Sequence, residues 1–332
     1  MGFLKKTILI ILIITYPVQF LWSEGNYKYD MRIVGRHDAD VLCVFVNENN
    51  TKVATGSLDE TIKVWSIPEG KELLHLKGHF GAVNSVSFSG NDKWIASGSA
   101  DMTVREWDAT TGEQLNILTG HTDQVIGVYF SQDDSSTFIA STSFDKTVKL
   151  WDTRLASEIK TLRGHTKPTN SVAYSYDGKF IASCSDDSTI KIWSTDLTTK
   201  ECLKTLRGHE APVLAVLYSF DSKLLISADQ NGVIKVWDMP EGTCRLTFQA
   251  HKQLIQDVSI AEDNKTIVSA SLDSTVKLWD ITTGENLMTL NAGVEIWGVD
   301  MVSDASIIII GCADGTVRFL TREQENKKRK GK

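Results

Sequence analysis

The sequence predicts an all-β protein built from seven copies of one four-stranded unit arranged around an axis. The first observation is a histidine that recurs every 42 to 44 residues, at His37, His79, His121, His165, His209 and His251. The second is a tryptophan that follows each histidine after 28 residues, or 30 in the third unit, at Trp65, Trp107, Trp151, Trp193, Trp237 and Trp279. The third is a division of each interval into short strand-forming runs without a helical stretch.

Four strands are expected in each unit. In the second unit the runs VNSVSF, WIASGS, TVREW and EQLNIL are rich in β-branched and aromatic residues, and turn residues such as SGND and ATTG separate them. Successive short runs of this kind indicate a meander of antiparallel hairpins. A single sheet of four strands cannot bury both of its faces, so neighbouring units must stack around an axis to form a core.

The repeated segments point to a known family. GSLDETIKVW, GSADMTVREW, TSFDKTVKLW, CSDDSTIKIW and ASLDSTVKLW agree in order and spacing, and a seventh unit fits the same frame with Ala292 in place of histidine and Leu320 in place of tryptophan. This 40–45-residue period with Gly-His and Trp-Asp marks resembles the WD-repeat family. The resemblance covers Tyr27 to Thr321 and implies a seven-bladed β-propeller of four-stranded antiparallel blades.

The N-terminal part of the repeat region predicts how the ring closes. Residues 27–33 alternate apolar and charged side chains, as a half-buried strand does. Met31 precedes His37 by the same interval as Leu73 precedes His79, although no blade of its own stands before it. The seventh unit lacks its outer strand. The resemblance implies that the N-terminal strand completes the last blade, which removes an exposed edge.

The chain divides into three parts: a hydrophobic leader (1–25), the propeller (26–321) and a charged tail (322–332). The leader has a basic start and an apolar stretch, as in a signal peptide or signal anchor; the alternative is an incorrectly assigned start. Lys327 to Lys330 resemble a nuclear-import signal. Because WD-repeat propellers are overwhelmingly intracellular, the cytoplasm or nucleus is favoured over the secretory pathway.

Composition argues against several classes of ligand. The five cysteines form no CxxC pair and are odd in number, so they predict neither a disulfide framework nor a zinc site. The net charge is −7 although both ends are basic, and an acidic body repels phosphate backbones. No glycine loop of the phosphate-binding type is present. We therefore expect no nucleic acid, metal or cofactor, and no stable membrane span beyond the leader.

Each unit also contains the residue types of a hydrolase triad. A hydrolase needs one nucleophile beside an oxyanion hole, so repeated copies, each tied to a tryptophan, favour a structural role, with a hydrolase as the unfavoured alternative. The resemblance implies a buried hydrogen-bonded tetrad in each blade. The predicted tetrads are Thr55, His37, Asp59, Trp65; Ser97, His79, Asp101, Trp107; Ser141, His121, Asp145, Trp151; Ser183, His165, Asp187, Trp193; Ser227, His209, Asn231, Trp237; and Ser269, His251, Asp273, Trp279.

Two units depart from this pattern. In the fifth, Asn231 stands where the others have aspartate, and Asp229 lies two residues earlier, so we expect a weakened tetrad. The seventh keeps only Asp314. We expect this blade to depend on apolar packing and on the closing strand.

The expected function is a non-catalytic scaffold that binds partner proteins or peptides. In the family, partners dock around the central channel, where side chains five residues after each histidine and just before each aspartate project. Apolar residues at these positions predict a partner-binding patch. They are Leu42, Leu58, Ile126, Phe144, Leu272 and Trp297.

A second hypothesis concerns Trp151-Asp152-Thr153-Arg154. This segment matches the W-D-x-R box with which some WD-repeat substrate receptors dock on the adaptor of cullin ubiquitin ligases. The resemblance would give Asp152 and Arg154 the adaptor-binding role. The next unit reads Trp193-Ser194-Thr195-Asp196 and lacks the arginine, although the family often has two successive boxes.

Overall fold

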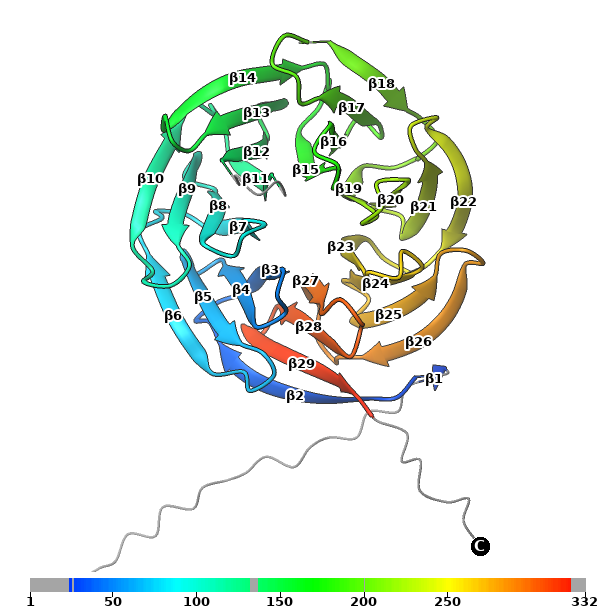
Figure 1. Ribbon diagram of the computed structural model, residues 1–332. Coiled ribbons are helices and arrows are strands. Elements are labelled where there is room, and N and C mark those ends of the chain that lie inside the picture. The colour runs from blue at the N-terminus through cyan, green and yellow to red at the C-terminus, as the bar shows by residue number, and fades with distance from the viewer. Residues whose placement is uncertain (1–23, 26, 132–136, 200, 324–332) are drawn as a thin grey trace, which may run out of the picture.

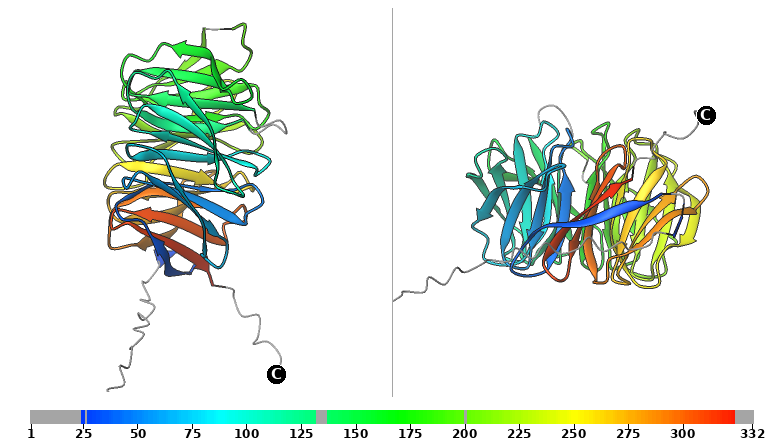
Figure 2. Two further views of the ribbon diagram at one scale, coloured as in Figure 1. Left: turned by 90° about the vertical axis from the view of Figure 1, so that its left-hand side faces the viewer. Right: turned by 90° about the horizontal axis from the view of Figure 1, so that it is seen from below.

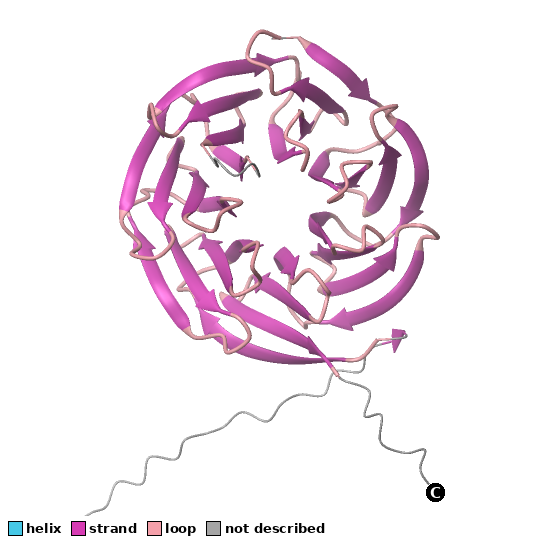
Figure 3. Ribbon diagram, in the orientation of Figure 1, coloured by secondary structure: helices cyan, strands magenta, loops and turns pink. Residues whose placement is uncertain are grey.

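The computed structural model describes residues 24–25, 27–131, 137–199 and 201–323. These residues form only strands and loops (Figure 3). Seven antiparallel sheets stand around a central channel, with the first strand of each blade innermost (Figure 1). Seen from the side, the ring is a thick disc (Figure 2). The prediction of a seven-bladed propeller with four-stranded blades is therefore confirmed.

The first four blades follow the chain order. Blade one comprises β3 (Val41–Val46), β4 (Lys52–Ser57), β5 (Thr61–Ser66) and β6 (Glu72–Lys77); blade two comprises β7 (Val83–Phe88), β8 (Trp94–Ser99), β9 (Thr103–Asp108) and β10 (Gln114–Thr119); blade three comprises β11 (Val125–Phe130), β12 (Phe138–Ser143), β13 (Thr147–Asp152) and β14 (Ser157–Arg163); blade four comprises β15 (Thr169–Tyr174), β16 (Phe180–Ser185), β17 (Ile190–Ser194) and β18 (Cys202–Leu206).

The last three blades include both ends of the described chain. Blade five comprises β19 (Val213–Tyr218), β20 (Leu224–Asp229), β21 (Val233–Asp238) and β22 (Thr243–Gln249); blade six comprises β23 (Ile255–Ile260), β24 (Thr266–Ser271), β25 (Thr275–Asp280) and β26 (Glu285–Asn291), with β1 (Glu24–Gly25) added outside β26; blade seven comprises β27 (Ile296–Met301), β28 (Ile307–Cys312), β29 (Thr316–Arg322) and β2 (Tyr29–Arg36).

The N-terminal strand β2 closes the ring by pairing with β29. The pairing is antiparallel and places Met31 opposite Leu320. Tyr29 is buried beside it, and its hydroxyl donates a hydrogen bond to the carbonyl of Ala305 at 2.5 Å. The predicted closure is confirmed, and it covers what would otherwise be the free edge of blade seven.

The two-residue strand β1 lies within the predicted leader. Glu24 and Gly25 pair with Thr289 and Met288 on the outer strand of blade six. The predicted leader, 1–25, thus overlaps this sheet at its last two residues. Residues 1–23 and the Lys327–Lys330 run lie outside the described residues.

The hydrophobic core lies between the blades. Ile62 and Leu76 of blade one, for example, pack with Phe88, Ile95 and Trp107 of blade two in one buried cluster. Each blade thereby buries one face against each neighbour, which is why the strands carry apolar residues on both faces. This packing holds the loops at the two ends of every blade in fixed positions.

Candidate functional site

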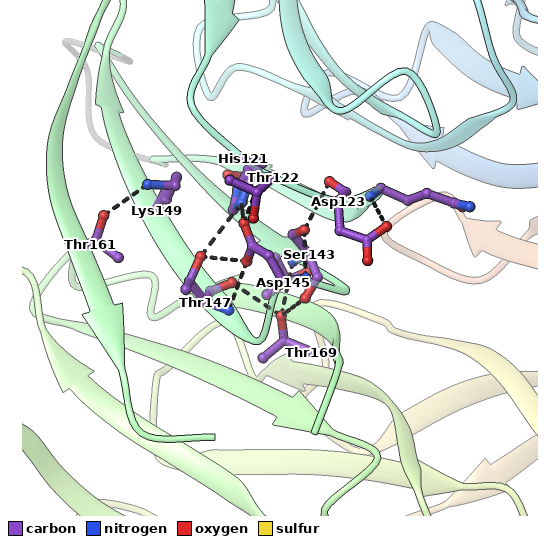
Figure 4. A network of polar contacts seen from close by, with 12 residues as sticks. His121, Thr122, Asp123, Ser143, Asp145, Thr147, Lys149, Thr161 and Thr169 are labelled. Carbon is purple, nitrogen blue, oxygen red and sulfur yellow. Dashed lines mark hydrogen bonds and ion pairs between the residues drawn. The ribbon is translucent and has the colours of Figure 1, made fainter. Parts of the chain in front are cut away.

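The tetrad residues of blade three form a continuous chain of hydrogen bonds. The indole Nε1 of Trp151 lies 2.8 Å from Ser141 Oγ, which lies 2.7 Å from His121 Nε2. His121 Nδ1 lies 2.7 Å from Asp145 Oδ2. Asp145 also accepts hydrogen bonds from the backbone N–H of Thr122 and from Thr147, as Figure 4 shows. This series of hydrogen bonds joins the loop before blade three to the second and third strands of the blade.

The same arrangement recurs in four other blades. The hydroxyl–imidazole and imidazole–carboxylate distances all lie between 2.7 and 3.0 Å. The sets are Thr55, His37, Asp59, Trp65; Ser97, His79, Asp101, Trp107; Ser183, His165, Asp187, Trp193; and Ser269, His251, Asp273, Trp279.

The donor and acceptor groups of the four side chains determine which atom carries each proton in a set. An indole N–H can only donate, so the serine oxygen accepts from tryptophan and donates its own proton to histidine Nε2. The proton on Nδ1 is then donated to aspartate. Burial lowers the pKa of His79, which favours the neutral ring. Burial alone would raise the pKa of Asp187, but hydrogen bonds from Thr189, Thr166 and His165 outweigh it and lower that pKa to about 2.

These sets are unsuited to nucleophilic catalysis. The hydroxyl-bearing residues, such as Ser97 and Ser141, are 0% exposed, so a substrate carbonyl has no route to the oxygen. Each oxygen also accepts the indole N–H, which reduces its nucleophilic character. What the arrangement can do is hold a turn, a loop and two strands together.

The expectation that Asn231 completes the fifth set, and that this set is weakened, is wrong. Asp229 takes the role instead: its Oδ2 lies 2.7 Å from His209 Nδ1, and His209 Nε2 lies 2.7 Å from Ser227 Oγ. Trp237 Nε1 donates to the same serine at 2.9 Å. Asp229 occupies the position where most other blades carry a serine, for example Ser99, and from there its carboxylate reaches the imidazole directly.

Blade seven replaces the missing imidazole with a guanidinium. Arg318 is buried and donates from Nη1 to the carbonyl of Ala292 and from Nη2 to Asp314 Oδ2, both at 2.7 Å. Its Nε donates to Thr316 at 2.8 Å. Blade seven therefore keeps a polar link between the loop and the turn, in addition to the apolar packing that we expected.

Sequence reasoning missed Arg318, although a signal was available. A lysine or arginine stands at the corresponding position of every unit: Lys63, Arg105, Lys149, Lys191, Lys235, Lys277 and Arg318. In blades one and six the lysine already donates to the carbonyl of the residue before the tetrad histidine, from Lys63 to Arg36 and from Lys277 to Ala250. An arginine at this position can reach both the loop and the turn.

A repeated β-bulge decides which side chains line the channel. In each blade the pairing of the first two strands skips one residue, the fifth after the histidine position. A bulge leaves its extra residue unpaired and re-aims the side chain. The skipped residues are Leu42, Asn84, Ile126, Asn170, Leu214, Gln256 and Trp297, and all seven line a central channel with a volume of about 650 Å³.

The residues of the predicted partner-binding patch separate into two groups. Leu42, Ile126, Phe144 and Trp297 line the channel, whereas Leu58 and Leu272 lie on turns away from it. Trp297 is half-buried, and its ring nitrogen is a buried donor without a hydrogen-bond partner among the described residues.

Sequence reasoning also missed Phe80, whose side chain, at 83% exposed, is the most exposed large apolar one among the described residues. It directly follows His79, in the loop between β6 and β7. This loop lies at the channel end that carries the tetrad histidines, which we call the histidine face. A signal was present: the residue after the tetrad histidine is polar in the other five units, as Asp38 and Thr122 illustrate.

The predicted adaptor box comprises the last two residues of β13, Trp151 and Asp152, and the first two residues of the β13–β14 turn, at the face opposite the histidine face. Asp152 is buried, and its Oδ2 lies 3.0 Å from Arg154 Nη2. The side chain of Arg154 is 65% exposed. The two residues are therefore paired with each other, with the guanidinium reaching solvent.

The described part of the chain holds no cluster of three or more histidine, cysteine or acidic residues suited to a metal ion. Within the same residues no helix is long and apolar enough to cross a membrane.

Comparison with known proteins defines the class of this protein. Six segments match the family described as "WD domain, G-beta repeat": 30–66, 70–108, 112–152, 156–194, 200–238 and 242–280. Each runs from an outer strand to the third strand of the next blade. The chain therefore belongs to the WD-repeat family.

Two individual proteins are similar to it. The crystal structure of the WD40 β-propeller domain of Doa1 superposes with a TM-score of 0.76 at 27% sequence identity, covering 94% of this chain and 100% of that domain. The 66 kDa stress protein of Physarum polycephalum is 34% identical over 68 residues, which are 20% of this chain. The matched segment spans only 11% of that stress protein.

Proposed function

We propose that this protein is a non-catalytic scaffold that binds a partner protein on its histidine face. WD-repeat propellers generally bind other proteins. The observation that carries the proposal here is a group of exposed apolar side chains on the loops of blades one to three. They are Leu58 (52% exposed), Phe80 (83%), Met102 (45%) and Phe144 (38%).

The position of these side chains supports recognition rather than packing. Leu58, Met102 and Phe144 lie in the turns between the second and third strands of three consecutive blades, and Phe80 lies in the loop between the first two of those blades. Apolar groups gathered on one face of a soluble protein mark an interaction site, and aromatic residues contribute most to such sites. Leu58 and Phe144 belong to the predicted patch, and Leu42, Ile126 and Phe144 line the channel.

The experiment compares affinity purification of three forms of the intact protein from extracts of its own cells. The double variant Phe80→Ser, Phe144→Ser is expected to lose partners that the unchanged protein recovers. The control is Leu155→Ser, because Leu155 is 68% exposed but lies in the β13–β14 turn at the opposite face. Equal recovery by all three forms, with equal thermal stability, would show that partners dock elsewhere.

A second candidate function is adaptor docking through the Asp152–Arg154 pair. The exposed guanidinium, held by hydrogen bonds to Asp152 from Nη2 at 3.0 Å and Nε at 3.3 Å, is presented in a fixed direction. Co-purification with a cullin adaptor that is lost in Arg154→Ala would support this role. Its absence from the unchanged protein would exclude it.

A further inference from the structure

The channel has a second end, at the face opposite the histidine face, with a chemistry of its own. Phe45, Tyr129 and Asp300 are the next-to-last residues of the innermost strands β3, β11 and β27. Glu48, Tyr176, Phe220 and Glu262 lie in the turns that follow innermost strands. We call these seven residues the acidic–aromatic end; all of them line the channel.

The ionisable side chains that line the channel are acidic, without a basic residue among those described. Five carboxyl-bearing residues line it: Glu48, Asp186, Asp257, Glu262 and Asp300. No lysine, arginine or histidine stands among the described residues of its wall. Neither Glu48 nor Glu262 has an ion-pair partner within the described chain. Burial, together with the nearby carboxylates of Asp92 and Glu262, raises the pKa of Glu48.

Aromatic rings from four blades form the other wall. Phe45 and Tyr129 meet edge to face with ring centroids 5.6 Å apart, which is possible because the intervening blade carries the small residue Ser87 at this level. Tyr176 and Phe220 stack with centroids 4.5 Å apart. Ring faces and carboxylates together attract organic cations, because both present negative potential while the rings also cover an aliphatic stem.

Tyr218 adds a buried polar group without a partner to the residues that line the same channel. Tyr218 is 3% exposed, lines the channel, and its hydroxyl has no hydrogen-bond partner among the described residues. A buried hydroxyl without a partner is costly, and its free oxygen lone pairs can accept from an N–H donor. This observation is independent of the carboxylates.

We propose that the acidic–aromatic end binds a basic side chain, an arginine or lysine, of a partner peptide. The ammonium or guanidinium would lie among Glu48, Glu262 and Asp300, with the aliphatic stem against Tyr176 and Phe220. Asp300 is itself held in place: it accepts hydrogen bonds from Ser259 Oγ at 2.6 Å and from the backbone N–H of Val46 at 2.7 Å. This site is separate from the apolar group on the histidine face and does not depend on it.

Titration calorimetry of the full chain with short peptides tests the proposal. The probes are alanine pentapeptides, blocked at both ends, with arginine, lysine or norleucine in the centre. Saturable binding of the arginine or lysine peptide, and none of the norleucine peptide, is expected. Tyr176→Leu removes the cation–π contact and Glu48→Gln removes the charge pair, so each should weaken binding about tenfold, which corresponds to about 1.4 kcal/mol.

Matched variants show whether the aromatic ring and the carboxylate themselves hold the cation. Tyr176→Phe keeps the ring and should bind like the unchanged chain, and Leu155→Ser, at an exposed residue of the same face that does not line the channel, should have no effect. Binding that is unchanged in both Tyr176→Leu and Glu48→Gln, or equal for the norleucine peptide, would overturn the proposal. So would binding that appears only after Lys327–Lys330 are replaced by serine, since the occupant would then be the chain's own basic run.

Discussion

His209 Nδ1 lies 2.7 Å from Asp229 Oδ2, and both side chains are almost entirely buried. This pair shows that the hydrogen-bonded chain of a blade tolerates a shift of its carboxylate by two residues along the sequence. Asp229 Oδ1 also accepts the backbone N–H of Asn231 at 2.9 Å, and it thereby holds the turn that other blades hold with a serine hydroxyl.

The first prediction follows from this pair. Asp229→Ala should lower the free energy of unfolding by about 1–3 kcal/mol, because the buried imidazole N–H loses its acceptor. Asn231→Ala should change it by less than about 0.5 kcal/mol. Chemical denaturation of the two variants measures both effects. A larger loss in Asn231→Ala than in Asp229→Ala would return the structural role to Asn231.

Arg318 gives the second prediction. Arg318→Met keeps much of the apolar stem but leaves the Ala292 carbonyl and the Asp314 carboxylate without their donor, so we expect a loss of about 1.5–3 kcal/mol. Hydrogen exchange should accelerate most in β27, β28 and β29. The control is Lys235→Met in blade five, whose ammonium only contacts Thr247 and is partly exposed. Equal acceleration in both variants would mean that the guanidinium has no special role.

Ring closure gives the third prediction. Tyr29 is 4% exposed and anchors β2 to the turn of blade seven. Tyr29→Ala should cost about 3–5 kcal/mol, as large-to-small changes of buried aromatic residues do. Tyr29→Phe should cost only about 1 kcal/mol because it removes one hydrogen bond and keeps the ring. Thermal melting distinguishes the two; equal melting temperatures for all three forms would show that β2 adds little.

The fourth prediction concerns the buried carboxyl of Asp257, which links blade six to blade seven by accepting the backbone N–H of Val299 at 3.1 Å. Burial raises the pKa of Asp257 to about 8. The folded state therefore holds this proton more tightly than the unfolded chain, whose aspartate pKa is about 3.9. Stability from this group is complete below about pH 4 and falls as the pH rises towards 8.

The prediction for Asp257 is checked by measuring the unfolding free energy between pH 4 and pH 8. One proton corresponds to a slope of at most about 1.4 kcal/mol per pH unit. The advantage in unfolding free energy of the unchanged protein over Asp257→Asn should therefore shrink as the pH rises from 4 to 8. A decline that is equally steep in Asp257→Asn would show that other groups titrate.

Much of this architecture could be predicted because the repeat imposes the same physics seven times. The interval from Met31 to His37 matches that from Leu73 to His79 and predicts an outer strand, and the resemblance to WD-repeat propellers implies that this strand closes the ring. Counting by position failed where one contact is made from a different position. Asp229 binds the tetrad histidine from two residues before the usual aspartate position. Arg318 stands at the position of the repeated lysine and takes over the link that the histidine makes in other blades.

The surface was harder to predict than the core. Leu58 directly precedes a tetrad aspartate, whereas Trp297 stands at the bulge five residues after the histidine position, and one is 52% exposed while the other is half-buried in the channel. The difference depends on the bulge that turns Trp297 inward and on the side chains that neighbouring blades contribute. Phe80 could have been found by comparing single positions across the units, because only there is an aromatic residue exposed after the histidine.

The most direct test of the central claim compares Ser141→Ala with the double variant Phe80→Ser, Phe144→Ser in one experiment. Unfolding free energy and partner recovery are measured for each. Ser141→Ala should lose about 1–3 kcal/mol of stability and keep its partners, because the buried hydroxyl only links Trp151 to His121. The double variant should keep its stability and lose its partners. Unchanged stability of Ser141→Ala, together with unchanged partner recovery by the double variant, would contradict the account.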